Sequence, residues 1–170
     1  NDESFQKILK IIKEIRALGM EACATLGMLD KNQAEKLASA GLTAYNHNLD
    51  TSPQFYGQII TTRLFADRLK TIEHVRNAGI TVCSGGIIGR GESKIDRINL
   101  IKSLAKLTPH PESVPINTLV PVKGTPLEKN KAVRPIDIVR LVATTRIVMP
   151  KSRIRLSAGR SELSEEAQVM

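Results

Sequence analysis

The chain has 170 residues and a net charge of +8, with 41% hydrophobic and 25% charged residues. That length provides one domain with a sizeable core but is short for a complete eight-stranded α/β barrel, which needs about 250 residues. The composition is that of a globular protein, and no apolar run approaches the roughly 18 residues that cross a bilayer, so we expect no membrane partner. Basic residues are scattered and aromatic residues make up only 3%, which argues against nucleic-acid binding.

A recurring helix-to-strand unit organises the chain. Apolar residues at helical spacing predict a first helix over residues 5–15. A small residue, then glycine, then an apolar run recurs at Gly19, Gly41 and Gly79, where a helix would end in the left-handed conformation and a strand would begin. The expected strands are 21–26, 43–48, 81–84, 114–119 and 154–156. The expected helices after the first are 31–39, 65–77, 93–107, 135–148 and one that starts near Ser164.

This alternation predicts parallel strands joined by right-handed crossovers, in either a doubly wound sheet or a barrel. Polar or reactive residues fall at the carboxyl end of every expected strand, and a barrel directs all such ends to one mouth. These residues are Cys23, the Asn46-His47-Asn48-Asp50 set, Cys83, Asn117 and Arg155. We therefore predict a single partial domain over residues 1–170, an incomplete eight-stranded α/β (TIM-type) barrel with about five βα units, corresponding to roughly strands 3 to 7.

Two cysteines and one arginine are candidates for a metal site. Cys23 and Cys83 show no pattern of a secreted disulfide framework, which favours a reducing compartment. Each is either a small buried apolar residue or a thiolate ligand, and iron–sulfur clusters normally require four cysteines. Arg155 lies in an apolar strand, so we expect it to point into the barrel, where a guanidinium must be paired or coordinated.

Three further segments each have two interpretations. Residues 84–92 are rich in glycine and form either a flexible strand-to-helix turn or a loop that lets a ligand approach the backbone. Residues 45–52, YNHNLDTS, offer donors and acceptors for an amide, a ureido group or a ribose, or else form a turn with Asp50 or Ser52 as a helix cap. His47 by itself is more typical of a structural residue. Arg68 is either a solvated helix charge or a carboxylate clamp.

The segments YNHNLDTS, ITTR, VCSGGIIGRGE, PESVPIN, KGTPL and RLSAGR, in this order, resemble the biotin synthase family of the radical S-adenosylmethionine superfamily. The resemblance covers nearly all 170 residues. It implies an eight-stranded barrel that uses a 4Fe-4S cluster and S-adenosylmethionine to generate a 5′-deoxyadenosyl radical, and that transfers sulfur from a 2Fe-2S cluster into dethiobiotin. It also implies reducing electron-donor proteins, a homodimer when full length, and a bacterial cytoplasm or a mitochondrial matrix.

The resemblance further implies roles for individual residues. Ligands of the 2Fe-2S cluster would be Cys23, Cys83 and Arg155. Dethiobiotin would be held by Asn48 and Asn117. S-adenosylmethionine would contact Asp50 through its ribose, Arg68 through its carboxylate, and Gly86, Ile87 and Val120 through its nucleoside.

Two features of the family are absent from the chain. The Cys-x-x-x-Cys-x-x-Cys motif that binds the 4Fe-4S cluster is missing, and so is a third cysteine for the 2Fe-2S cluster. In a full-length member both would precede Asn1, so we expect a partial sequence that is inactive alone. The alternatives are another radical enzyme such as a lipoyl synthase or a maturase, and a non-catalytic ligand-binding barrel. A basic nucleic-acid-binding protein is a third.

Overall fold

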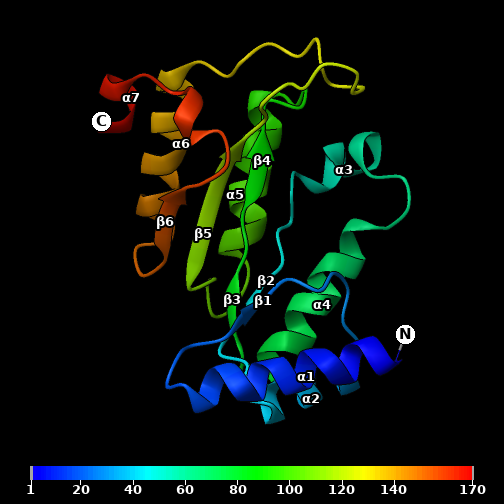
Figure 1. Ribbon diagram of the computed structural model, residues 1–170. Helices are drawn as coiled ribbons and strands as arrows, with labels where there is room; N and C mark the ends of the chain where they lie inside the picture. The colour runs from blue at the N-terminus through cyan, green and yellow to red at the C-terminus, as the bar shows by residue number, and fades with distance from the viewer. Residues whose placement is uncertain (1, 170) are drawn as a thin grey trace. The chain divides into compact units, whose positions relative to one another are not determined.

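The computed structural model describes residues 2–169, which fall into two compact units (Figure 1). The first unit comprises Asn1–His47 and Ala66–Cys83, and the second comprises Asn48–Phe65 and Ser84–Met170. The strands are β1 (Cys23–Ala24), β2 (Ala44–Asn46), β3 (Thr81–Cys83), β4 (Gly86–Ile88), β5 (Ser113–Thr118) and β6 (Arg153–Leu156). The helices are α1 (Asp2–Ala17), α2 (Lys31–Ser39), α3 (Pro53–Ile59), α4 (Phe65–Asn77), α5 (Lys94–Ala105), α6 (Pro135–Val148), the 3-10 helix η1 (Arg160–Glu162) and α7 (Glu165–Val169).

The first unit is a parallel arrangement of β1, β2 and β3 with helices α1, α2 and most of α4. Cys23 and Thr81 both align with Ala44, one from each neighbouring strand. The helices end as the glycine pattern predicted, because Gly19, Gly41 and Gly79 all have positive φ. Leu37 of α2 is fully buried in this unit.

Tyr45 is the polar centre of this core. Its side chain is fully buried, its hydroxyl donates to the Gly27 carbonyl at 2.8 Å, and the Leu26 N–H donates to the hydroxyl at 3.0 Å. The Tyr45 hydroxyl therefore fixes the segment after β1, which has little secondary structure of its own. Burial raises the pKa of Tyr45 to about 12.

Replacing Tyr45 with Phe should lower the free energy of unfolding by about 1–3 kcal/mol, because two part-buried backbone groups lose their partner. A second signature lies in the pH dependence. Since the folded pKa is raised, the contribution of Tyr45 is complete below pH 10 and is lost as the pH rises towards 12. Urea unfolding at pH 8 and pH 11 tests both points. A wild-type chain equally stable at both pH values, or a Tyr45→Phe variant as stable as wild type, would contradict them.

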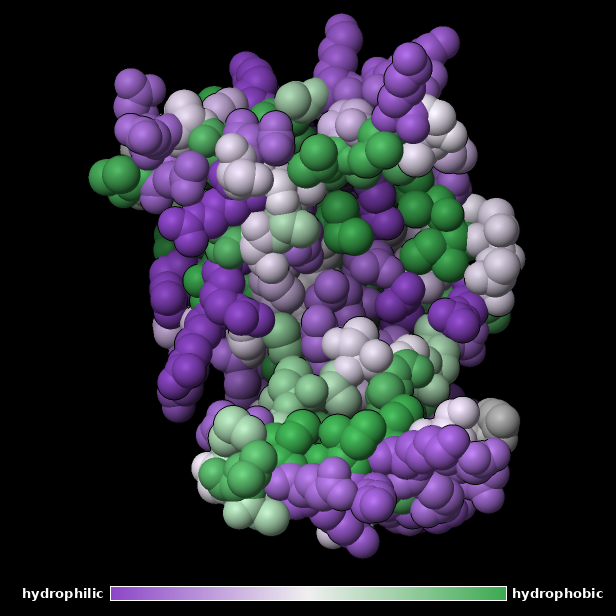
Figure 2. Space-filling model, in the orientation of Figure 1, coloured by the Kyte–Doolittle hydropathy of each residue, from purple (hydrophilic) through white to green (hydrophobic). Residues whose placement is uncertain are grey.

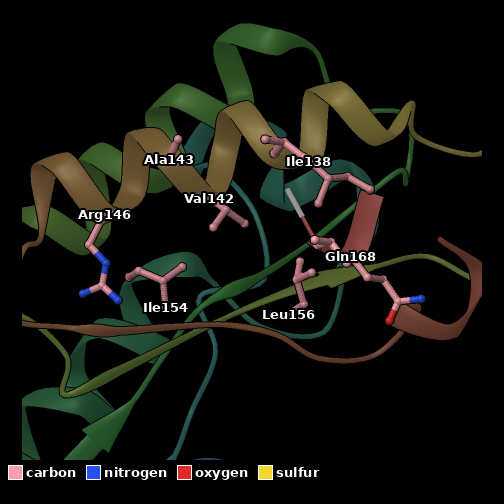
Figure 3. A pocket seen from close by; sticks show the side chains of 9 residues that line it. Ile138, Val142, Ala143, Arg146, Ile154, Leu156 and Gln168 are labelled. Atoms are coloured by element: carbon pink, nitrogen blue, oxygen red, sulfur yellow. The ribbon is translucent and has the colours of Figure 1, made fainter. Parts of the chain in front are cut away.

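The second unit is built on β4, β5 and β6, again all parallel. Ile116 of β5 aligns with Gly86 on one side and Leu156 on the other. Alternate residues of β5 point to opposite faces, and Val114 and Ile116 are buried on one of them. On β6, Ile154 and Leu156 are half-buried and point towards α6, as Figure 3 shows.

The structure has three elements that the sequence did not predict, one of them the 3-10 helix η1. Gly86–Ile88 forms strand β4, so there are six strands among the described residues and not five. The glycine-rich segment was interpreted either as a flexible strand-to-helix turn or as a loop that lets a ligand approach the backbone. Pairing with β5 instead makes part of it a strand, although glycine has low strand propensity. The third element is α3, which begins at Pro53 with Ser52 as its N-cap. The helix-cap interpretation of Ser52 is therefore confirmed.

No helix in the described range 2–169 is long and apolar enough to cross a membrane. Apolar side chains are nevertheless exposed along and just after α1, including Ile11, Leu18 and Met20. Figure 2 shows apolar surface in this region.

Candidate functional site

The predicted site residues divide between the two units. Cys23, Cys83 and Arg68 belong to the first unit. The second unit holds the larger set: Asn48, Asp50, Gly86, Ile87, Asn117, Val120 and Arg155. Each set is described within its own unit.

Cys23 and Cys83 lie on the same face of the first unit's sheet. Residues aligned across parallel strands point to one side, and so do residues two apart on a strand. Cys23 aligns with Ala44 and Cys83 with Asn46, so all four share a face, opposite the buried Val82. The cysteines were expected at equivalent strand ends, and this is wrong for Cys23, which begins β1. Cys23 is exposed and Cys83 is buried.

Neither cysteine belongs to a group of three or more His, Cys, Asp or Glu residues that could hold a metal ion, within the residues described. The chain therefore offers two thiols on one face but not a complete ligand set. His47 supports the structural interpretation, because it is buried and its ring lies 6.1 Å from that of Tyr45. Arg68 lies half-buried in the first turn of α4.

Asp50 adopts an unusual backbone conformation in the second unit. Its φ is +68°, the one positive value at a non-glycine residue in the described range. The Thr51 N–H donates to the Leu49 carbonyl at 2.9 Å, which closes a three-residue turn around Asp50. Asp50 also forms a parallel bridge with Gly86, to which the resemblance assigned the nucleoside. Two predicted cofactor residues are thus neighbours.

Asn48 binds the backbone of the glycine-rich segment. The Gly85 N–H donates to Asn48 Oδ1 at 3.0 Å, and the Gly85 carbonyl accepts from the N–H groups of Leu49 and Asp50 at 3.0 and 3.2 Å. A Cβ at Gly85 would lie 1.9 Å from the Pro115 carbonyl oxygen. Only glycine fits between these segments.

Asn117 joins three parts of the second unit. Its Nδ2 donates to the Gly86 carbonyl at 3.1 Å, and the Ala158 N–H donates to its Oδ1 at 3.0 Å. The side chain is 8% exposed. One N–H of its amide remains available for a ligand. By strand alternation and register, Asn117 and Ile87 share a face of the sheet.

Arg155 differs from its prediction. It was expected to be buried inside the barrel, but it is exposed. It aligns with Pro115 on β5, so it shares the Asn117 face, opposite to the one that α6 covers. Val120 is also exposed, directly after β5.

A buried carboxylate was missed in the sequence. Glu92 accepts from the Gly89 N–H at 2.8 and 3.0 Å, from the Arg90 N–H at 2.8 Å and from Arg97 Nε at 2.8 Å. Its side chain is 2% exposed. This carboxylate fixes the loop after β4. The local sequence did not identify it, because its hydrogen-bond partners are apparent only in the folded loop.

Two cavities of the second unit lie away from the predicted residues. One, of about 460 Å³, lies beside this loop and is lined by Arg97, Lys129 and Lys131 among others. The other, of about 430 Å³, lies between α6, β6 and α7 and is mostly apolar (Figure 3). Ile154 and Leu156 line the second cavity, so it opens on the face of β6 opposite Arg155. It contains none of the predicted site residues.

Comparison with protein families identifies the chain. The model of the Radical SAM superfamily matches residues 1–104. The chain belongs to this superfamily. The model of the Biotin and Thiamin Synthesis associated domain matches residues 115–170 of this radical SAM protein.

Curated relatives of this radical SAM chain include biotin synthases. That of Allorhizobium ampelinum is 62% identical over 168 residues, which cover 99% of this chain and 51% of the relative. That of Synechococcus elongatus is 63% identical over 166 residues, covering 98% of this chain and 52% of the relative. The chain thus spans about half the length of the curated relatives it matches.

Solved structures of two other proteins share the fold. Methylornithine synthase is similar with a TM-score of 0.78 and 19% identity, covering 90% of this chain and 47% of that one. The hydrogenase maturase HydG is similar with a TM-score of 0.80 and 18% identity, covering 96% of this chain and 39% of that one. The predicted fold class, a partial α/β barrel of parallel strands and alternating helices, is therefore confirmed.

Proposed function

We propose that this chain is part of a biotin synthase, which inserts sulfur into dethiobiotin to form biotin. The observation that carries the proposal is the identity of about 62% to curated biotin synthases along nearly the whole chain. Radical SAM membership adds S-adenosylmethionine and an iron–sulfur cluster as the class of cofactors. The protein would work in a bacterial cytoplasm or a mitochondrial matrix, as a homodimer that receives electrons from donor proteins.

The chain's residues fit one side of a two-iron cluster site. Thiolates are the usual ligands of such clusters, and Cys23 and Cys83 present two of them on one sheet face. By the resemblance, Arg155 would be the further ligand. The 2Fe-2S cluster would supply the sulfur, and the remaining ligands, like those of the 4Fe-4S cluster, would come from other parts of the protein. The chain's own part is to place and shield these groups.

The second unit fits the two small molecules. Asn48 and Asn117 each bind a backbone N–H through an amide oxygen. An amide side chain combines donors with an acceptor, as the ureido ring of dethiobiotin requires, so these two residues would hold the substrate. Asp50 would accept hydrogen bonds from the ribose hydroxyls of S-adenosylmethionine. Gly86 would allow close approach, and Ile87 and Val120 would cover the nucleoside. Arg68, a residue of the first unit, would bind the carboxylate of S-adenosylmethionine.

Anaerobic reconstitution tests the proposal in the protein extended to the length of its curated relatives. With iron and sulfide, it should show two cluster types by absorption spectroscopy and convert dethiobiotin to biotin. Changing Cys83 to Ala should remove the two-iron absorption and biotin formation, because a thiolate ligand is lost. Val82→Ala is the matched control. It truncates a buried neighbour on the opposite sheet face, so the two-iron signal should remain.

Other outcomes would contradict the proposal. One cluster type without biotin formation would indicate a different radical enzyme. The absence of any cluster would indicate a non-catalytic barrel. Equal loss of the two-iron signal in Val82→Ala would show that the Cys83 effect comes from misfolding.

A further inference from the structure

The Asp50 turn needs external support. A left-handed backbone is unfavourable for a residue with a Cβ, and Asp50 has a φ of +68°. Such conformations persist where the surrounding structure holds them, and they concentrate at functional sites. The contacts that hold this turn therefore determine where the Asp50 carboxylate lies.

The Asp50 carbonyl accepts two hydrogen bonds. One comes from the Ile87 N–H at 2.9 Å, and the other from Arg90 Nη2 at 2.6 Å. The first is a backbone contact that follows from the bridge between Asp50 and Gly86. The second is made by a side chain and carries a full positive charge, which strengthens it. Of these two supports, substitution can remove only the one from Arg90 while the backbone stays intact.

Arg90 is itself held in place. It is 9% exposed, and its own N–H donates to Glu92 Oε2 at 2.8 Å. Glu92 also accepts from Gly89 and from Arg97, so the base of the Arg90 side chain lies in a rigid loop. The arginine thus connects an anchored loop to the strained turn.

We infer that Arg90 is a positioning residue that fixes the Asp50 turn for the nucleoside of S-adenosylmethionine. The inference rests on the proposed function, in which Asp50 binds the ribose. Arg90 acts on the nucleoside of S-adenosylmethionine through Asp50. Its charged hydrogen bond is to the Asp50 carbonyl, so removing that bond should affect the ribose contact first.

Equilibrium binding to the reconstituted protein, extended to the length of its relatives, tests the inference. Arg90→Met keeps the length of the side chain but removes the donor. It should raise the Kd for S-adenosylmethionine about tenfold, which is about 1.4 kcal/mol. The Kd for dethiobiotin, measured without S-adenosylmethionine, should not change. Arg90→Lys keeps one charged donor and should recover part of the affinity. Arg140→Met, at an exposed position of α6, is the control and should bind both ligands as wild type does.

Two results would overturn the inference. One is an unchanged Kd for S-adenosylmethionine in Arg90→Met, and the other is an equal rise in the Kd values of S-adenosylmethionine and dethiobiotin. Asp50→Asn separates this failure from that of the proposed function. If Asp50→Asn weakens S-adenosylmethionine binding and Arg90→Met does not, only the inference about Arg90 fails. If Asp50→Asn has no effect either, the proposed ribose contact itself is wrong.

Discussion

Replacing Gly85 with Ala should destabilise the protein by about 3 kcal/mol or more, the upper range for overpacking of a buried site. The added Cβ would lie 1.9 Å from the Pro115 carbonyl oxygen and 2.8 Å from its carbon. Both are backbone atoms, so no side-chain rotation relieves the clash. The Gly85 backbone is also held from the other side by Asn48 and Leu49, which prevents it from moving away.

Gly57 provides a matched control for this substitution. It lies within α3, and a Cβ there would meet nothing within 4 Å. Ala is favoured over Gly inside a helix by about 0.5–1 kcal/mol, so Gly57→Ala should stabilise the protein slightly. Urea unfolding of both variants compares them directly. Similar free energies of unfolding for the two variants would contradict this prediction. They would show that the backbone at Gly85 can move far enough to relieve the clash with Pro115.

The same substitution should also affect ligand binding. Gly85 connects the segment that carries both Asn48 and Asp50 to the start of β4. Displacing Gly85 should therefore shift Asn48, proposed to contact dethiobiotin, and Asp50, proposed to contact the ribose, at the same time. We therefore expect Gly85→Ala to weaken the binding of both ligands, whereas Arg90→Met should weaken only the binding of S-adenosylmethionine.

The fold could be predicted from sequence because its signals are local. Glycine after a helix at Gly19, Gly41 and Gly79 marked three helix ends, and apolar periodicity located the helices between them. Strand β4 was missed because its residues have weak strand preference, and its pairing partner β5 follows only after α5. Such non-local pairing is not visible in the local pattern.

The site was harder to predict than the fold. The residue types at Asn48 and Asn117 indicated hydrogen bonding, but not that their amides bind backbone groups far apart in the sequence. Arg155 was expected to be buried because it lies in an apolar strand. In the structure only alternate residues of β6 are covered, and Arg155 is one of the others. Arg90 and Glu92 were missed because their partners become apparent only when the chain is folded.

Replacing Asn117 with Asp should cost about 2–4 kcal/mol of stability at neutral pH, although the two side chains have the same shape. The carboxylate can still accept from the Ala158 N–H. Its second oxygen, however, would replace the Nδ2 that donates to the Gly86 carbonyl at 3.1 Å, so two acceptors would face each other in a buried site.

The pH dependence of this variant should reveal the cause of its instability. Burial beside a carbonyl oxygen raises the pKa of the introduced carboxyl, since only its protonated form can donate to Gly86. A raised pKa in the folded state means that stability is present below the unfolded pKa and is lost as the pH rises through the folded value. Asn117→Asp should therefore approach wild-type stability near pH 4 and fall behind it at pH 7.

Asn130→Asp is the matched control, because Asn130 Nδ2 donates to the Gly89 carbonyl at 3.0 Å but the residue is only half-buried. Solvent can hydrate a carboxylate at position 130, so the loss of free energy of unfolding should be smaller there and nearly independent of pH. Urea unfolding of both variants at pH 4 and pH 7 decides between two roles for Asn117. A large, pH-dependent loss at Asn117 alone means that the amide holds β4, β5 and the Ala158 segment together before any substrate binds. Equal, small losses would mean that these segments are held without Asn117, which would leave the dethiobiotin contact as its main role.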